Sequence, residues 1–220
     1  QMFFVPQSTL VAVALRDQVG MIDYSDFSVR IFPRRFDSDQ RQALLNTYYS
    51  LLFSSFSKSF WVLDEDRPFI YHKDGDSKSD DDWRTIDLSK HIGSGSGLGI
   101  GVASTEDDLL AITTDDGSEG LVYFPQQDRI LSTGPMRTVG TTNEPMIMPY
   151  IDAYTQHVIF ADVQGNVALF DLKKGDEKPQ RFTVDFSPRF IRTGWLESTW
   201  ILAGDKGIMF QSFDDPSDRR

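Results

Sequence analysis

The chain has 220 residues, of which 33 are acidic and 22 basic, giving a net charge of −11, and it has no cysteine. Such an acidic surface lacks the clustered lysine and arginine that nucleic acids require, so we expect no nucleic-acid partner. The absence of cysteine excludes disulfides, thiolate nucleophiles and Cys-ligated zinc. No apolar run is long enough to span a membrane, and the first residues lack the pattern of a signal peptide, so we expect no membrane insertion.

Two apolar runs separated by a short polar turn recur five times along the chain, and each pair predicts a β-hairpin. The paired runs are 10–15 and 19–22, 60–63 and 68–71, 109–113 and 121–124, 157–161 and 166–171, and 200–203 and 208–210. The turn markers Asp17, Asp66, Asp116, Gln164 and Asp205 lie 49, 50, 48 and 41 residues apart. A nearly constant period in this range is typical of radial repeats.

Further apolar runs keep the same phase. Those at 83–86, 129–131 and 181–184 follow a hairpin and predict an outer strand, and those at 98–103, 146–151 and 189–193 precede a hairpin and predict an inner strand. Each repeat therefore offers the four strands of a propeller blade, and stacking such blades covers the apolar faces of each small sheet. An all-β sandwich is the alternative, but it gives no reason for a constant period.

The sequence thus predicts an all-β fold, a β-propeller of about five four-stranded blades over residues 1–213, alone or as part of a larger ring, with a polar tail at 214–220. The last repeat lacks an outer strand. Residues 2–5 are one candidate to supply it as a latch from the other end of the chain.

Residues 38–56 depart from the repeat. Asp37 and Gln40 have the spacing of a capping box, and apolar side chains follow at helical intervals. These are Leu44, Leu45, Tyr48, Tyr49, Leu52, Phe53 and Phe56. We expect a helical insertion that either packs on the ring or docks a partner through Leu44, Tyr48, Leu52 and Phe56. The repeat phase alternatively places an inner strand at 49–54.

No segment of the sequence matches the residue spacing of the cofactor-binding, metal-binding or catalytic motifs that we considered. The glycine-rich stretch 93–101 matches neither G-x-G-x-x-G nor a P-loop, so we interpret it as a linker and expect no cofactor. The acidic run 74–82 does not fit an EF-hand loop, and the three histidines lack paired-ligand spacing, so we expect no metal. No G-x-S-x-G elbow is present. These absences favour a protein that is not an enzyme.

Trp83 is the strongest candidate for ligand binding. It follows the acidic run and precedes Arg84 at the start of a predicted outer strand. Sugars stack on aromatic faces while charged side chains bond their hydroxyls, so Trp83 and Arg84 with Tyr71 and Arg67 form a chemically adequate set.

Two resemblances follow from these motifs. The order of Arg67 to Tyr71, then Trp83, then Gly97 to Ser104 resembles one blade of the fungal fucose-lectin-like and tachylectin-like propellers, although the tryptophan does not recur at Ser132 or Phe182. Asn166 to Asp171 resembles the Gly-x-Val-x-Leu-Phe-Asp ending of WD40-like repeats. The resemblance to lectins implies a glycan partner.

The sequence therefore favours a non-catalytic recognition module that binds carbohydrate. The alternative is a protein-protein interaction scaffold that uses the apolar stripe of residues 44–56. A propeller glycoside hydrolase is the third hypothesis, for which no pair of carboxylates can be nominated among the 33 acids.

Overall fold

The computed structural model describes residues 2–4, 9–14, 18–33, 51–54, 56–64, 66–74, 83–92, 96–104, 107–136, 149–175, 177–193 and 198–213. Within these ranges the chain forms nineteen β-strands and one short 3-10 turn, Pro125–Gln127. The chain divides into two compact units. The first comprises Gln1–Gly99 with Thr105–Asp108, and the second comprises Ile100–Ser104 with Leu109–Arg220.

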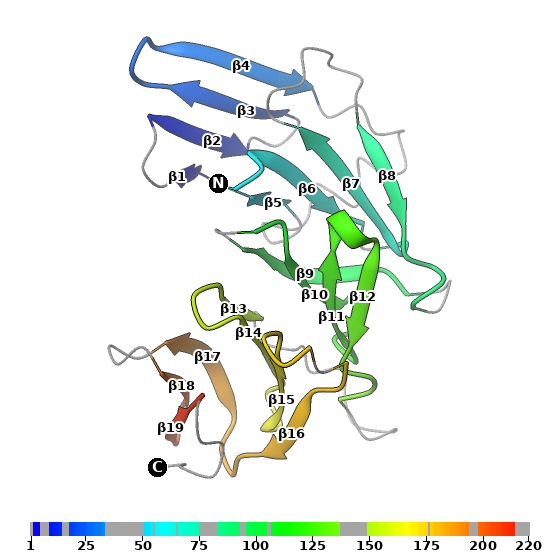
Figure 1. Ribbon diagram of the computed structural model, residues 1–220, viewed down its shortest axis with the longest axis vertical. Helices are drawn as coiled ribbons and strands as arrows, with labels where there is room; N and C mark the ends of the chain where they lie inside the picture. The colour runs from blue at the N-terminus through cyan, green and yellow to red at the C-terminus, as the bar shows by residue number, and fades with distance from the viewer. Residues whose placement is uncertain are drawn as a thin grey trace. The chain divides into compact units, whose positions relative to one another are not determined.

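The first unit contains two four-stranded sheets, each an up-and-down meander (Figure 1). Sheet 1 consists of β1 (Met2–Phe4), β2 (Leu10–Ala14), β3 (Gln18–Asp23) and β4 (Ser28–Pro33). Sheet 2 consists of β5 (Leu51–Ser54), β6 (Ser59–Leu63), β7 (Phe69–Asp74) and β8 (Arg84–Asp87). Neighbouring strands in both sheets are antiparallel.

The second unit contains three sheets, except that the first two residues of β9 belong to the first unit. Sheet 3 consists of β9 (Leu98–Ala103), β10 (Leu110–Thr114), β11 (Gly120–Phe124) and β12 (Arg129–Ser132). Sheet 4 consists of β13 (Tyr150–Asp152), β14 (His157–Ala161), β15 (Asn166–Asp171) and β16 (Gln180–Thr183). Sheet 5 consists of β17 (Pro188–Thr193), β18 (Thr199–Gly204) and β19 (Ile208–Ser212).

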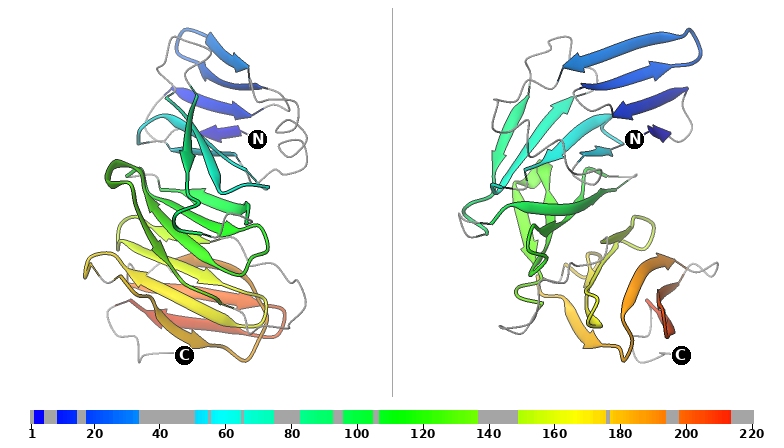
Figure 2. Two further views of the ribbon diagram at one scale, coloured as in Figure 1. Left: turned by 90° about the vertical axis from the view of Figure 1, so that its right-hand side faces the viewer. Right: turned by 180° about the vertical axis from the view of Figure 1, so that it is seen from behind.

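Sheet 4 buries apolar side chains on both of its faces. Val158 and Phe160 of β14 belong to one core cluster with Val122 of sheet 3. Ile159, which points to the opposite face, belongs to a second cluster with Trp200 of sheet 5. Sheets 3, 4 and 5 therefore stack face to face, as Figure 2 shows within this unit. Stacking on both faces is the packing of propeller blades, whereas a two-layer sandwich leaves one face of each sheet outside the core.

All five predicted hairpins are present. They are β2–β3, β6–β7, β10–β11, β14–β15 and β18–β19. The predicted outer strands correspond to β8, β12 and β16, and the predicted inner strands to β9, β13 and β17. The sequence analysis missed β4, whose preceding turn carries Phe27 at a φ of 58°, where glycine or asparagine is the usual signal.

The predicted helix at 38–56 is wrong for its last part. Leu51–Ser54 is strand β5, paired with β6, as the repeat phase had indicated. Leu52 and Phe53 are both buried, with 5% and 9% of their surfaces exposed. Because successive side chains of a strand point to opposite faces of a sheet, both faces of sheet 2 are covered at these two residues. Strand pairing thus overrides the helical spacing of the apolar residues. Leu44 and Tyr48 lie outside the described residues, as does the predicted tail at 214–220.

The predicted latch is also wrong. Met2–Phe4 pairs with β2 of its own sheet, with Met2 opposite Val13, and so does not complete the last sheet. In the parts of the chain that the structure describes, no helix has the length and apolar character needed to cross a membrane.

Candidate functional site

Two of the four residues predicted to bind a ligand lie around Asp64, in the turn between β6 and β7. The buried Tyr71 donates its hydroxyl to Asp64 Oδ2 at 2.9 Å. The backbone N–H groups of Asp66 and Arg67 donate to Asp64 Oδ1 at 3.0 and 3.2 Å. Asp64 therefore closes this turn, and Tyr71 is committed to an internal contact, with its ring buried away from solvent.

The other two predicted residues lie at the opposite end of β7. Arg84 is the cross-strand neighbour of His72, and Trp83 precedes it. The Trp83 ring is partly buried and lies under the ammonium of the buried Lys73, with 5.9 Å between the nitrogen and the ring centroid. The structure thus brings Trp83 and Arg84 together but separates them from Arg67 by the length of the strand. Their role in ligand binding stays a prediction.

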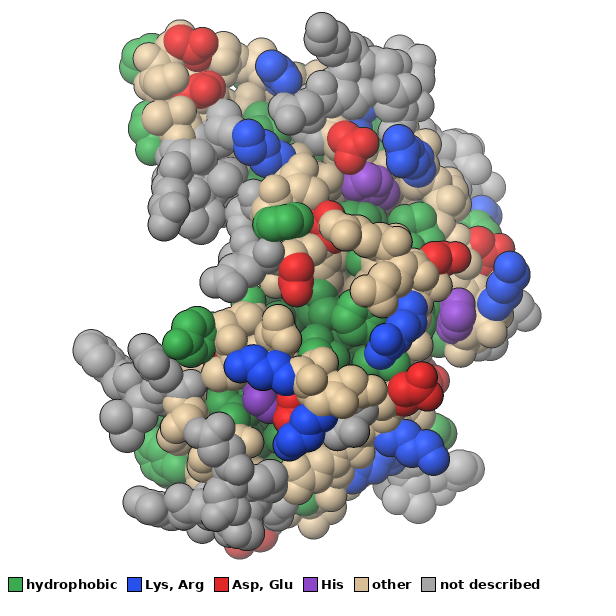
Figure 3. Space-filling model, viewed as in Figure 1, with side chains coloured by type: hydrophobic (Ala, Val, Ile, Leu, Met, Phe, Trp, Pro, Cys, Tyr) green, Lys and Arg blue, Asp and Glu red, His purple; other side chains and the backbone are tan. Residues whose placement is uncertain are grey.

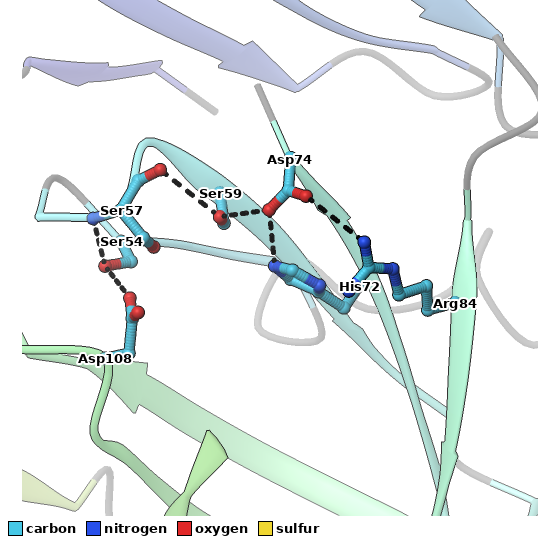
Figure 4. A network of polar contacts seen from close by, with 7 residues as sticks. All are labelled: Ser54, Ser57, Ser59, His72, Asp74, Arg84 and Asp108. Atoms are coloured by element: carbon cyan, nitrogen blue, oxygen red, sulfur yellow. Dashed lines mark hydrogen bonds and ion pairs between the residues drawn. The ribbon is translucent and has the colours of Figure 1, made fainter. Parts of the chain in front are cut away.

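A polar network surrounds Asp74 at this end of sheet 2 (Figure 4). Its Oδ1 accepts a hydrogen bond from Ser59 Oγ at 3.3 Å and lies 3.4 Å from His72 Nε2. Its Oδ2 lies 3.9 Å from Arg84 Nη2, whose side chain is largely exposed. The His72 ring stacks on Trp61 with 3.9 Å between centroids. The network ties together three strands, β6, β7 and β8.

The same serine-rich corner fixes the β5–β6 turn. Ser54 Oγ donates to Asp108 Oδ1 at 3.0 Å and accepts from the backbone N–H of Ser57 at 3.3 Å. The buried Ser54 therefore links β5 to the segment that precedes β10 without a free hydroxyl for chemistry.

Serine, histidine and aspartate in one network suggest a catalytic triad, but their order is wrong. Catalysis requires the imidazole to lie between the hydroxyl and the carboxylate, so that it can take the hydroxyl proton. Here the Asp74 carboxylate lies between Ser59 and His72 (Figure 4). Burial lowers the pKa of His72, although the Asp74 charge acts in the opposite direction. Among the described residues His72 contacts Trp61 and Asp74, and its imidazole makes no hydrogen bond to a serine hydroxyl there.

A second histidine–aspartate pair occupies sheet 4. His157 and Asp171 are cross-strand neighbours, with 3.7 Å between Nε2 and Oδ2, and Lys174 Nζ lies 2.7 Å from the same oxygen. The buried His157 ring stacks on Phe213 at 4.2 Å. Burial lowers the pKa of His157, opposed by the Asp171 charge. Asp74 and Asp171 are each the last residue of the third strand of their sheet. Both carboxylates accept hydrogen bonds from neighbouring groups, so an aspartate at this position stabilises the end of the strand in both sheets.

Exposed apolar side chains gather instead on the β3–β4 hairpin. Tyr24 and Phe27 in its turn are 51% and 80% exposed, and Val29 and Ile31, which share one face of β4, are 56% and 51% exposed. Figure 3 shows hydrophobic side chains beside carboxylates at this hairpin tip. Large apolar side chains held in solvent are a feature of interaction surfaces.

The hairpin tip has a defined conformation. Asp23 Oδ1 accepts hydrogen bonds from both the backbone N–H and the hydroxyl of Ser25, at 2.9 and 2.7 Å. Asp26 Oδ1 accepts from the N–H of Ser28 at 2.8 Å. These carboxylates hold the turn that presents Phe27. The sequence analysis missed this surface, although aromatic residues in a turn dominated by Asp and Ser were its signal.

Of the residues predicted to dock a partner, the structure describes Leu52 and Phe56. Leu52 is buried in β5 and is not available to a partner. Phe56, in the β5–β6 turn, is 56% exposed. The stripe inferred from helical spacing is therefore not a single surface in the described part of the chain, and the contact role of Phe56 stays a prediction.

Comparisons with known proteins support the fold. No family model and no curated protein matches the chain. Among solved structures, a chain of the mitotic checkpoint complex matches with a TM-score of 0.61 and 14% identity, over 99% of this chain and 65% of that one. The β-propeller domain of Cps50 (Swd1) from Myceliophteria thermophila matches with a TM-score of 0.62 and 12% identity, over 99% of this chain and 69% of that one.

The prediction of an all-β propeller is thereby confirmed. The comparisons support the β-propeller fold that both resemblances share, and the resemblance to lectins gains no support. Identities of 12% and 14% bear on the fold alone.

Proposed function

We propose that the chain is a non-catalytic propeller that binds protein partners, and that the β3–β4 hairpin is one of its contact surfaces. The observation that carries the proposal is the exposure of Tyr24, Phe27, Val29 and Ile31 on a hairpin whose turn is fixed by two carboxylates. Tyrosine and other aromatic residues supply much of the binding energy of protein interfaces.

A protein partner fits the described residues better than a glycan. Of the four residues expected to bind sugar, Tyr71 is buried and donates to Asp64, and Arg67 lies at the far end of β7 from Trp83. An enzymatic function also lacks support, because the serine and histidine of sheet 2 do not touch one another in a productive order. The hairpin, by contrast, exposes aromatic side chains, and covering them with a partner protein would be favourable because it removes apolar surface from water.

The contribution expected from the hairpin is large enough to measure. Burying an exposed Phe side chain contributes about 1.5–3 kcal/mol. Tyr24 and Phe27 start half or more exposed, so removing both is expected to weaken binding by about 2–4 kcal/mol, which is roughly thirtyfold to a thousandfold in Kd.

The test uses photo-crosslinking and affinity capture. A photoreactive phenylalanine analogue replaces Phe27 in one sample and Tyr154, which is 69% exposed in the second unit, in a matched control. We expect a specific cross-linked protein from position 27 that is absent from position 154. Capture of that protein should fall in Tyr24→Ser/Phe27→Ser and persist in Tyr154→Ser. Equal capture by both variants, with both folded by circular dichroism, contradicts the proposal.

A further inference from the structure

The turn that joins β3 to β4 holds an aromatic residue that its own folding disfavours. The register of the two strands ends at the pair formed by Asp23 and Ser28, so Tyr24 to Phe27 form the turn. Phe27 has a φ of 58° and is 80% exposed. The left-handed region suits glycine and asparagine, and water disfavours an apolar ring, so phenylalanine is unfavourable here on both counts.

The other residues in the same conformation are polar. In the parts of the chain that the structure describes, the other non-glycine residues with a positive φ are Lys58, Asp128 and Gln156. Polar side chains lose little by exposure to water, whereas the ring of Phe27 does not gain from it. A residue held in an unfavourable conformation is typical of functional sites. Phe27 is thus better suited to a contact with another molecule than to the stability of its own turn.

The exposure of this turn does not depend on what covers the faces of sheet 1. Val29 and Ile31 belong to β4, and a sheet packed on their face would bury them. Tyr24 and Phe27 instead lie beyond the last pair of the β3–β4 ladder, in the turn that extends past the two strands. A partner can therefore reach these two rings whether or not that face of the sheet is covered.

Two carboxylates accompany the exposed rings, and no basic residue lies between Asp23 and Val29. Asp23 holds the turn, because its Oδ1 accepts hydrogen bonds from the N–H and the hydroxyl of Ser25. Hydrogen bonds with Thr9 and Ser25 lower the pKa of Asp23, so this carboxylate is ionised at neutral pH. Figure 3 shows carboxylates beside hydrophobic side chains at the hairpin. The turn therefore presents negative charge next to apolar surface.

Asp26 is the carboxylate best placed to meet a ligand. It is exposed and directly precedes Phe27 in the chain. Its Oδ1 accepts a hydrogen bond from the N–H of Ser28 at 2.8 Å. A carboxylate has about four acceptor positions, so Asp26 can accept further hydrogen bonds while it holds the turn.

A cation matches this combination of a ring and a carboxylate. An arginine guanidinium can stack flat on an aromatic face and can donate two parallel N–H groups to a carboxylate. A neutral segment would cover the ring but would leave the Asp26 charge without a partner, and an anionic segment would be repelled. The net charge of −11 also attracts basic segments from a distance. A basic segment therefore suits the turn better than a neutral or acidic one.

We infer that the β3–β4 turn binds an arginine of the partner protein, with the guanidinium stacked on the Phe27 ring and paired with the Asp26 carboxylate. This assignment rests on the proposed function, because it specifies what the partner presents to the hairpin. Tyr24, which is 51% exposed, adds apolar surface for the residue beside the arginine. Phe27 contributes a cation–π contact, which an aliphatic side chain of similar size could not make.

The first experiment needs no partner protein. The probe is the acetylated and amidated peptide Gly-Leu-Arg-Leu-Gly. The comparison peptide carries citrulline, which has nearly the shape of arginine but no charge, in its place. Each peptide is titrated into the full chain, and the NMR signals of the Phe27 and Ser28 amides are followed. We expect the arginine peptide to bind at least about threefold more tightly, because citrulline loses both the ion pair and the cation–π contact.

A matched pair of variants tests the carboxylate. Asp26→Asn keeps the oxygen that accepts the Ser28 N–H and removes the charge. Asp87→Asn makes the same change in another exposed turn, where Asp87 Oδ1 accepts the N–H of Ser89 at 2.8 Å. The affinity for the arginine peptide should fall about twofold to fivefold in Asp26→Asn and should stay unchanged in Asp87→Asn.

Phe27→Asn separates binding from folding. Asparagine tolerates the left-handed conformation, so this variant should have a Tm about 2–4 °C above that of the wild type. It should bind the arginine peptide about twofold to fivefold more weakly, and so should Phe27→Leu, which keeps apolar surface but removes the ring. A lower Tm in Phe27→Asn together with unchanged peptide binding means that Phe27 serves the fold, and it overturns the assignment.

The protein cross-linked from position 27 separates this assignment from the proposed function. Its capture by the wild type should weaken as salt rises, and its capture by Asp26→Asn should be weaker and less sensitive to salt. Equal capture by Asp26→Asn and Asp87→Asn means that the hairpin binds a protein but not through an arginine. Charge-dependent peptide binding without any captured protein means that the proposed function fails while recognition of arginine by the turn stands. Equal binding of the two peptides, or a dimer by light scattering that Asp26→Asn dissociates, overturns the assignment.

Discussion

Stacking between sheets 3 and 4 depends on the absence of a side chain at Gly120. A Cβ atom built at this position would lie 2.5–2.8 Å from three ring atoms of Phe160 on β14. Phe160 is fully buried and packs in the cluster that joins the two sheets. The Gly120→Ala variant therefore forces either the ring or the whole sheet to move.

The expected magnitude follows from two opposing effects. Replacing a strand glycine with alanine stabilises by about 0.4–1 kcal/mol when the site has room, because the unfolded chain loses freedom. Overpacking a dense core costs about 1–3 kcal/mol. The overlap with a buried ring makes the second effect dominant, so we expect a net loss of about 1–2 kcal/mol. For a chain of this size that corresponds to a fall of roughly 2–8 °C in Tm.

A double variant tests the cause. In Gly120→Ala/Phe160→Leu the smaller side chain relieves the overlap, so the double variant should lose less stability than the sum of the two single variants. Thermal unfolding monitored by circular dichroism gives the four values of the cycle. Additive losses, or a Gly120→Ala variant as stable as the wild type, would refute the contact between β11 and β14 and with it the face-to-face packing of these sheets.

Three further predictions concern turns and titratable groups. Gly204→Ala, whose added Cβ would overlap the carbonyl oxygen of Ser187, should cost about 1–3 kcal/mol in unfolding free energy, measured by urea titration. Asp64→Ala should lower stability by about 2–4 kcal/mol, because it removes the acceptor of three hydrogen bonds, from the Tyr71 hydroxyl and from two turn N–H groups. Tyr71→Phe, which keeps the turn bonds, should lose about 1 kcal/mol in the same urea titration. Burial lowers the folded-state pKa of His72 and His157, so the unfolded state binds more protons and stability should fall as the pH drops from about 6.5 toward 5. Urea midpoints for His157→Gln should show a smaller fall over that window, and an unchanged slope would contradict this assignment.

The hairpins were predictable because their signal is local. Alternating apolar residues and a polar turn specify both strands of β14–β15, whose register from Val158 to Ala161 follows from the Asp162–Gly165 turn. The positions of β5 and β1 depend instead on pairing with other strands. Leu52 and Phe53 fit a helix by spacing, and only their pairing with Trp61 and Phe60 makes them a strand.

The candidate site was harder to predict for the same reason. Arg67, Tyr71 and Trp83 are close in sequence. Arg67 precedes β7, whereas the register of β7 and β8 places Arg84 opposite His72, so Trp83 lies near the other end of β7 from Arg67. The exposed hairpin was missed because exposure is a property of packing. Val29 and Ile31 have the apolar character of core residues, and only the burial of the opposite face of sheet 1, where Met21 is 5% exposed, shows that they face solvent.

The acidic composition has a structural explanation in the described turns. Aspartates accept backbone N–H hydrogen bonds from residues two positions later at Asp23, Asp64, Asp87, Asp116, Asp162 and Asp171. Each such bond fixes a turn that any meander of short strands needs at every connection. A fold built of many short strands therefore uses many aspartates in its turns. These turn aspartates contribute to the net charge of −11, so the charge is not by itself evidence of an acidic ligand-binding site. The same charge disfavours anionic partners and attracts basic segments.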